Sequence, residues 1–223
     1  FEPLGVICSI MPWNFPYWQA LRFAAPCIMA GNVIAMKPSR ITMQSGIEIE
    51  KAFTESGMPD GIFQTVVGSI DSANHLIDSD VNAITFTGST NAGAKVGERA
   101  ARNLKKCVLE LGGSDPFIVL DDAIIDKAAE GAVKGRFINC GQSCVASKRF
   151  FVGKNIAKDF IELFIKKASQ LKIGDPMSME TDLGPISSKA GFETISGIVE
   201  DAKEKGAEIL LGGSEIDGKG FFY

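Results

Sequence analysis

A cysteine that follows a glycine-containing segment is the first residue whose surroundings could support chemistry. Cys144 ends the segment Gly141-Gln142-Ser143-Cys144, and the same stretch offers a second thiol, Cys140. Glycine leaves room for a substrate, and turned backbone amides favour the thiolate, the form that attacks a carbonyl carbon. We therefore take Cys144 as a candidate nucleophile, with a structural thiol as the alternative. The remaining cysteines stand in apolar runs typical of core positions: Cys8, Cys27 and Cys107.

Two polar side chains lie where strand-like runs end. Glu110 shares one face of its run with Val108, and burial there would raise the pKa of its carboxyl toward the range of a general base. An ion pair with a basic residue explains this glutamate equally well. Asn14 lies between two prolines in Pro12-Trp13-Asn14-Phe15-Pro16, where its amide could bind a developing oxyanion. A rigid turn with packed aromatic rings is the alternative.

Two further segments could hold a nucleotide. The stretch from Phe86 to Gly93 has a glycine at each end of a strand-to-helix turn, and amides at a helix start can bind phosphate. Such a turn uses glycine in any case. Lys37-Pro38-Ser39-Arg40 places two cations after a strand-like run. The two cations could simply be surface residues, which are common. If the segment lies beside a ribose, however, Arg40 would suit a 2′-phosphate.

Strand-like and helix-like segments alternate through the first half of the chain. The alternation predicts an α/β fold with a parallel sheet, helices on both faces, and ligands at the carboxyl ends of the strands. The expected strands are residues 4–10, 33–36, 63–67, 83–86 and 107–111. The expected helices are residues 17–30, 42–56, 72–77 and 92–103.

The pattern restarts after Gly112-Gly113, which predicts one domain over residues 1–111 and a second over residues 112–223. In the second domain the expected strands are residues 117–120 and 208–211, and the expected helices are residues 124–137, 156–171 and 187–205. Both ends of the sequence read as cut, because no initiator methionine opens the chain and a turn-like segment closes it.

Composition narrows the function classes. The 223 residues are 45% hydrophobic and 22% charged with a formal net charge of −4, so neither nucleic acid nor a membrane surface is an expected partner. A small molecule is the expected partner. No apolar run has the roughly 18 residues of a membrane span. A single histidine, His75, and the lack of Cys-x-x-Cys argue against a zinc site, so we expect no metal. Five unpatterned cysteines predict a reducing, cytoplasmic location.

The motifs taken together resemble the aldehyde dehydrogenase superfamily, in order and at matching spacing. The wording of Glu-Leu-Gly-Gly-Ser-Asp-Pro-Phe looks most like its succinate-semialdehyde dehydrogenase branch. The resemblance implies an internal fragment: a Rossmann-type parallel-sheet cofactor domain without its N-terminal part, and an α/β catalytic domain without its C-terminal part. The segments that carry it are Pro12-Trp13-Asn14-Phe15-Pro16, Lys37-Pro38, Phe86-Thr87-Gly88-Ser89-Thr90, Leu109-Glu110-Leu111-Gly112-Gly113 and Asn139-Cys140-Gly141-Gln142-Ser143-Cys144.

The resemblance also implies a role for each matching residue. Cys144 is the nucleophile, Glu110 the general base, and the Asn14 side chain with the Cys144 amide the oxyanion hole. The expected reaction oxidises an aldehyde to a free carboxylic acid through a thiohemiacetal and a thioester, with NADP or NAD as cofactor. The expected cofactor-binding residues are Met11, Trp13, Lys37, Ser39, Arg40, Gly68, Gly88, Ser89 and Leu111.

Substrate and cofactor preferences rest on three positions. Arg40 stands where NAD-preferring members often have glutamate, which favours NADP. Arg22 matches an arginine that succinate-semialdehyde dehydrogenases use on the substrate carboxylate, but a second such arginine is replaced by Ile138. Succinate semialdehyde is therefore the first expected substrate, and glyceraldehyde or another small hydroxyaldehyde is the alternative.

Two hypotheses other than an aldehyde dehydrogenase remain. The fragment could be an inactive nucleotide-binding domain, because the family's segment that holds the nicotinamide ribose would lie beyond Tyr223. A thiol esterase built on Cys144 and His75 is disfavoured, since His75 falls in an expected helix away from the strand ends. The resemblance further implies a homodimer or homotetramer for the parent protein.

Overall fold

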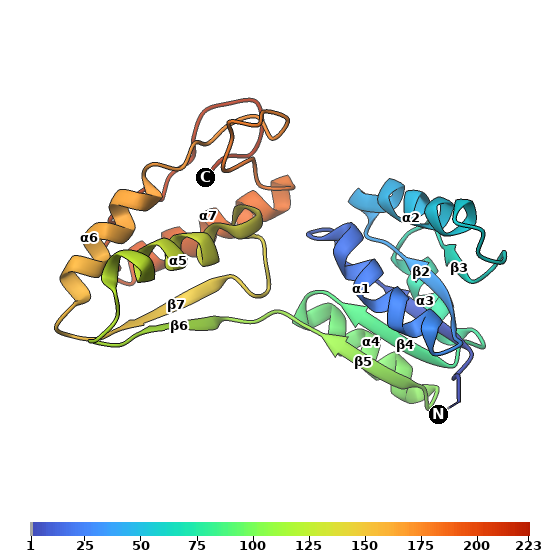
Figure 1. Cartoon of the computed structure of the whole chain (residues 1–223). Coiled ribbons are helices and arrows are strands. Elements are labelled where there is room, and N and C mark those ends of the chain that lie inside the picture. Colours follow the sequence, from blue (N-terminus) through green and yellow to red (C-terminus); the bar gives the residue numbers. More distant parts are fainter. Residues whose placement is uncertain (1) are drawn as a thin grey trace. The chain divides into compact units, whose positions relative to one another are not determined.

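The computed structural model describes residues 2–223, which form two compact units (Figure 1). The first unit ends at Gly112 and the second begins at Gly113. Each unit is described by itself below.

A five-stranded parallel sheet organises the first unit, in the order β3-β2-β1-β4-β5 (Figure 1). Its strands are β1 (Val6–Ile10), β2 (Val33–Lys37), β3 (Phe63–Thr65), β4 (Ala83–Thr87) and β5 (Lys106–Glu110). The helices between them are α1 (Pro16–Met29), α2 (Met43–Glu55), α3 (Ile70–Asp78) and α4 (Thr90–Arg102), with a 3₁₀ turn at Arg40–Thr42. Because each strand is followed by a helix that returns the chain, all carboxyl ends share one edge, as predicted from the alternation. β3 and β5 are the edge strands of this sheet.

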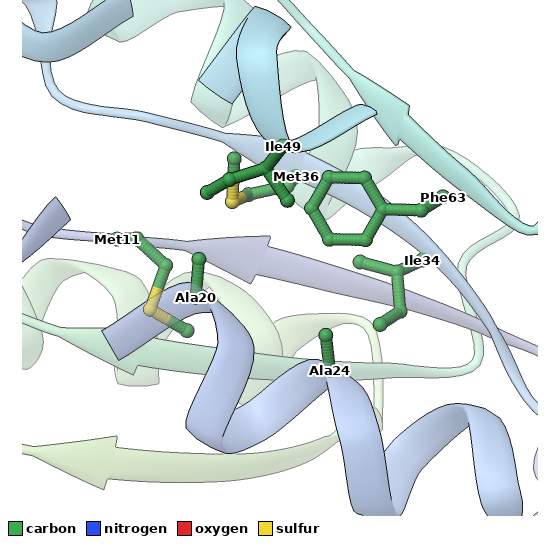
Figure 2. Close-up of a cluster of buried hydrophobic side chains, with 7 residues drawn as sticks. All are labelled: Met11, Ala20, Ala24, Ile34, Met36, Ile49 and Phe63. Atoms are coloured by element: carbon green, nitrogen blue, oxygen red, sulfur yellow. The ribbon is translucent and has the colours of Figure 1, made fainter. Parts of the chain in front are cut away.

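Two hydrophobic clusters cover opposite faces of this sheet. Alternate residues of a strand point to opposite faces, so neighbouring positions such as Ile7 and Cys8 serve different layers. One layer lies under α1 and α2, where α1 contributes the small side chains of Ala20 and Ala24 (Figure 2). The members of this cluster are Met11, Ala20, Ala24, Ile34, Met36, Ile49 and Phe63. The other lies under α3 and α4: Cys8, Ile77, Val81, Ile84 and Ala100.

The second unit is built on a strand–helix–strand motif. β6 (Asp115–Val119) and β7 (Ser147–Val152) pair in parallel, and α5 (Ile125–Phe137) connects them. A non-helical turn, Ile138–Gly141, follows α5 directly, and α6 (Ala157–Ala168) and α7 (Lys189–Glu204) come later. The core between the strands and helices is aromatic, with Phe150 against Phe164 at 5.4 Å between ring centroids.

Two sequence expectations differ from the structure in this unit. Residues 208–211 are not a strand, although their apolar run predicted one. No strand among residues 2–223 pairs with them, and Ile209 and Leu211 instead line an apolar hollow beside Phe164 of α6. Conversely, β7 was not predicted, because Lys148 and Arg149 conceal its apolar alternation. No helix within residues 2–223 is long and apolar enough to cross a membrane.

Candidate active site

The carboxyl edge of the five-stranded sheet carries most of the predicted cofactor residues. From β1 the sheet grows in one direction through β2 and β3 and in the other through β4 and β5, so its direction switches between β1 and β4. Ligands of open parallel sheets bind outside the carboxyl ends at such a switch point. Hydrogen bonds tie neighbouring ends together, from Met11 N–H to Lys37 O (3.1 Å) and from Gly88 N–H to Glu110 O (3.0 Å).

The segment after β1 leads directly into α1. Pro16 begins the helix, where a missing N–H costs nothing, and the Gln19 N–H donates to Phe15 O at 2.9 Å. Trp13 and Asn14 are half-buried at this turn. The Met11 side chain lies in the hydrophobic cluster beneath α1 (Figure 2), so only its main chain could face a ligand.

Lys37 is a buried cation at the end of β2. Its side chain has 5% exposure, and it forms neither an ion pair nor a side-chain hydrogen bond within residues 2–223. Burial lowers the pKa of its amine, and the charge of nearby Arg40 lowers it further. Two cations without a carboxylate partner fit an anionic ligand, because an anion would restore the interactions lost on burial. Ser39 is half-buried between them and Arg40 is exposed.

Glycine allows a close approach between strand ends and helix starts. A Cβ at Gly68 would overlap the Ser72 side chain on the first turn of α3, so this glycine lets the chain enter that helix. On α4, the Ser89 hydroxyl accepts a hydrogen bond from Ala92 N–H at 3.3 Å and caps the helix. The exposed start of this 13-residue helix, which Gly88 and the N-cap Ser89 precede, has the dipole and the first-turn amides that suit a phosphate.

The two faces of β5 differ as the alternation predicted. Cys107 packs in the cluster beneath α4, and Leu111 lies against Gly93 of the same helix. Glu110 points to the other face, but the burial considered for it is not observed, since this carboxylate is exposed. The reason is its position on an edge strand, where no helix of the first unit covers Val108 or Glu110; Val108 is itself 60% exposed.

The Cys144 loop in the second unit has an unusual backbone. Asn139, Cys140 and Gly141 all have positive φ, at 51°, 56° and 72°. Non-glycine residues rarely adopt this region, and such strain gathers at functional sites. The Arg136 guanidinium lies against Gly141, where burial lowers its pKa. Cys144 is half-buried, whereas the preceding Ser143 is 5% exposed and its hydroxyl has no partner within residues 2–223.

A residue not singled out in the sequence, Lys148, contacts this loop directly. Its Nζ donates to Ser143 O at 3.1 Å, to Cys144 O at 2.9 Å and to Ala146 O at 3.1 Å. A lysine beside an arginine is usually a solvated surface residue. No sequence signal distinguished this one, because its partners are main-chain carbonyls.

The predicted substrate residues lie on different units. Arg22 is exposed on α1, and its Nη2 donates to Gln19 Oε1 at 3.2 Å. Gln19 is 7% exposed, so a buried amide restrains an exposed guanidinium. Ile138, in the second unit, is 46% exposed directly before the strained loop. No cluster of three or more potential metal ligands occurs within residues 2–223.

A family model described as "Aldehyde dehydrogenase family" matches residues 1–223. The chain belongs to this family. A relative named succinate-semialdehyde dehydrogenase [NADP(+)] 1, from Mycobacterium tuberculosis (strain ATCC 25618 / H37Rv), is 46% identical over 224 aligned residues. The match covers 100% of this chain and 49% of the relative. An aldehyde dehydrogenase of Paenarthrobacter nicotinovorans is 42% identical, again over 100% of this chain and 49% of the relative.

Solved structures with the same fold include an aldehyde dehydrogenase and a protein bound to a nicotinamide cofactor. The NAD-dependent aldehyde dehydrogenase from Sinorhizobium meliloti superposes with a TM-score of 0.97 at 38% identity, covering 100% of this chain and 45% of that one. A structure of PnpE in complex with nicotinamide adenine dinucleotide gives a TM-score of 0.95 at 40% identity, covering 98% and 45%. These comparisons confirm the family and the α/β fold with parallel sheets. This chain spans about half the length of the curated relatives it matches.

Proposed function

We propose that the protein oxidises succinate semialdehyde to succinate with NADP or NAD, through a covalent intermediate on Cys144. The observation that carries this proposal is the Cys144 loop. In a chain of this family, the positive-φ residues Asn139, Cys140 and Gly141 lie shortly before the half-buried thiol of Cys144. A pre-shaped loop holds a nucleophile in one geometry before the substrate arrives.

The chain's own residues would divide the chemistry as follows. The Cys144 thiolate attacks the aldehyde carbon and forms a thiohemiacetal, while the Asn14 amide and the Cys144 N–H stabilise the oxyanion. When bound, the nicotinamide supplies the acceptor for the hydride. Glu110 then takes a proton from the water that attacks the thioester, which releases the acid and frees the thiol.

The carboxyl edge of the sheet supports cofactor binding. Gly88, Ser89 and the start of α4 would hold the pyrophosphate. Gly68 would lie on the adenine side, and Trp13 and Leu111 would border the cofactor cleft. Lys37 and Ser39 would meet the adenosine ribose, with Arg40 on a 2′-phosphate. Lys37, a buried residue with no ion pair within residues 2–223, lies next to Arg40, and these two cations favour NADP over NAD because they attract the additional phosphate. The names of several relatives also specify NADP(+).

Arg22 supports a substrate that carries a carboxylate. Its guanidinium would anchor the end of succinate semialdehyde remote from the aldehyde, and the relatives named succinate-semialdehyde dehydrogenase agree with that choice. Ile138 favours the second candidate, glyceraldehyde or another small hydroxyaldehyde, since it replaces a second carboxylate anchor with an apolar side chain.

A comparison of four cofactor and substrate pairs in the full-length protein tests this proposal. We expect NADP reduction with succinate semialdehyde to give the highest kcat/KM, measured by absorbance of the reduced cofactor. The other three pairs are succinate semialdehyde with NAD, and glyceraldehyde with each cofactor. A preference for glyceraldehyde would contradict the proposed substrate and indicate that Ile138 determines substrate choice. The proposed chemistry at the aldehyde would not be affected.

Substitution of the nucleophile separates catalysis from mere nucleotide binding. Cys144→Ala should abolish turnover, by at least about 10³-fold, while calorimetric affinity for NADP stays within threefold of the unsubstituted protein. Cys140→Ala is the matched control on the same loop, with turnover expected within about threefold. Retained turnover in Cys144→Ala would contradict the mechanism, and NADP binding without turnover in the unsubstituted protein would favour a binding role.

Location and assembly follow from the same proposal. All five cysteines are free thiols in the structure, which supports a reducing compartment, and we place the protein in the cytoplasm. We extend the family's homodimeric or homotetrameric assembly to the full-length protein, where sedimentation velocity can measure it.

A further inference from the structure

Lys148 fixes the orientation of peptide groups around Cys144. Its ammonium donates hydrogen bonds to three main-chain carbonyl oxygens, those of Ser143, Cys144 and Ala146, at 2.9–3.1 Å. Ala146 N–H also donates to Ser143 O at 3.3 Å, so this carbonyl is held from two directions. Hydrogen bonds to a charged donor are stronger than neutral ones, and three of them on one short segment restrain its peptide planes together.

The restraint on Ser143 O determines where the Cys144 amide points. Ser143 C=O and Cys144 N–H belong to the same peptide group, which is planar and trans, so they point in opposite directions. With the carbonyl turned onto Lys148, the Cys144 N–H is turned away from that ammonium. Within residues 2–223 this N–H donates to no other group, which leaves it available to a ligand.

We infer that Lys148 is a positioning residue that orients the Cys144 amide toward the oxyanion formed when the thiolate attacks a carbonyl. The inference rests on the proposed function and adds a residue to it. Lys148 itself touches only main-chain oxygens in the loop, so its contribution reaches the reacting atoms through the peptide plane. The positive charge of Lys148 could also assist catalysis in a different way, since a cation near Cys144 stabilises the thiolate.

Two reactions of the same thiol distinguish orientation from charge. Attack on p-nitrophenyl acetate creates an oxyanion, because the Cys144 sulfur bonds to the carbonyl carbon before p-nitrophenolate leaves. Alkylation by iodoacetamide displaces iodide and creates none. Both reactions need the thiolate. A change in charge would therefore slow both, whereas a misoriented amide would slow only attack on the ester.

The test compares full-length Lys148→Met with the unsubstituted protein. We expect ester acylation and dehydrogenase kcat to fall about 10- to 100-fold, less than the 10²–10³-fold typical of deleting an oxyanion donor, because the amide is still present. Alkylation of Cys144, KM for the aldehyde and NADP affinity should stay within threefold. Arg149→Met is the matched control. It removes the adjacent cation, whose Nε binds Ser114 O at 2.8 Å outside the loop, and acylation should stay within threefold.

A second variant keeps the inference testable if Lys148→Met does not fold. Lys148→Arg retains the charge, but a planar guanidinium does not converge on three carbonyls as an ammonium does, so acylation should fall at least threefold with alkylation unchanged. Equal losses in acylation and alkylation, or no loss in either, would overturn the orienting role. Cys144→Ala measures the background. If its ester reaction matched that of the unsubstituted protein, the proposed function itself would fail, whatever Lys148 does.

Discussion

Lys37 combines two properties that folding alone does not favour, a charge and a buried position. The five-stranded sheet places it at a strand end with 5% exposure, next to Arg40, and no carboxylate in the described part of the chain pairs with it. Such an arrangement costs stability in the free protein and gains its benefit when an anion binds. The same residue therefore links the stability of the first unit to its ligand.

Replacing Lys37 by methionine should separate these two effects. Methionine keeps the length of the side chain and removes the charge, so we expect the free energy of unfolding to hold or rise by about 1 kcal/mol. NADP affinity should fall by about tenfold, equivalent to about 1.4 kcal/mol. Chemical denaturation and calorimetry measure the two quantities. A large loss of stability with unchanged affinity would make Lys37 a structural residue.

The lowered pKa of Lys37 predicts a pH dependence of NADP binding. An anion favours the charged amine, so binding raises the pKa of Lys37 and takes up a proton wherever the free protein has lost it. Affinity should therefore fall with increasing pH once the pH exceeds the lowered pKa. Between the lowered pKa of Lys37 and the ordinary lysine pKa of 10.5, the free energy of unfolding of the free protein should rise with pH. In this range the unfolded chain holds a proton that the folded chain has lost.

Titration calorimetry from pH 7.5 upward checks this dependence and avoids the phosphate's own titration near pH 6. Lys37→Met should flatten the pH profile. NAD, which lacks the 2′-phosphate, should give a shallower slope in the unsubstituted protein. Identical slopes for Lys37→Met and the unsubstituted protein would assign the dependence to another group.

Individual residues were predictable where their type carries the chemistry and not where their contacts do. Cys144, Asn14 and Glu110 could be proposed from their side chains and neighbours, although their roles stay predictions. Lys148 could not, because its function in the loop depends on the direction of carbonyl groups. The exposure of Glu110 was also beyond the sequence, since it depends on β5 being an edge strand.

At the scale of elements, α4 is fitted to β5 through two glycines with different surroundings. A Cβ at Gly93 would overlap Leu111 Cδ2, whereas a Cβ at Gly97 would meet Leu109 Cδ1 at 3.3 Å. The same substitution on one helix should therefore have different consequences. Leu111 must move to accept a Cβ at Gly93, and Leu111 borders the proposed cofactor cleft.

Gly93→Ala and Gly97→Ala test this difference as a matched pair. We expect Gly97→Ala to be neutral or stabilising by up to about 1 kcal/mol, because alanine favours helix and Leu109 can yield slightly. Gly93→Ala should destabilise by about 1–3 kcal/mol and weaken NADP binding by displacing Leu111. Thermal unfolding and calorimetry provide both readouts. Equal effects of the two substitutions would contradict the packing described for α4.

Elements with strong periodicity were predicted closely, and those that depend on distant partners were not. α6 and α7 follow their apolar spacing to within a few residues. An apolar run becomes a strand only where another strand pairs with it, and residues 208–211 lack such a neighbour within the described chain. β7 has one in β6, which outweighs the charges at Lys148 and Arg149.

On the scale of the whole molecule, the first unit has a hydrophobic core of its own. Its sheet is covered by two internal hydrophobic clusters, and its hydrogen-bonded strands all lie before Gly112. We expect residues 2–112 to fold alone, with one cooperative thermal transition and NADP affinity within about tenfold of the full-length protein. Circular dichroism and calorimetry test this expectation. A non-cooperative melt would show that the unit depends on the remainder of the chain.

The outer edge of β5 bears on aggregation. No strand within residues 2–223 pairs with its outer side, so a row of N–H and C=O groups next to the 60% exposed Val108 is open to a strand from another molecule. Unpaired edges of this kind seed aggregation, and charged residues at their ends act as gatekeepers. Lys106 and Glu110 occupy those ends. Glu110 would then have a use besides chemistry, keeping newly made chains soluble while they fold.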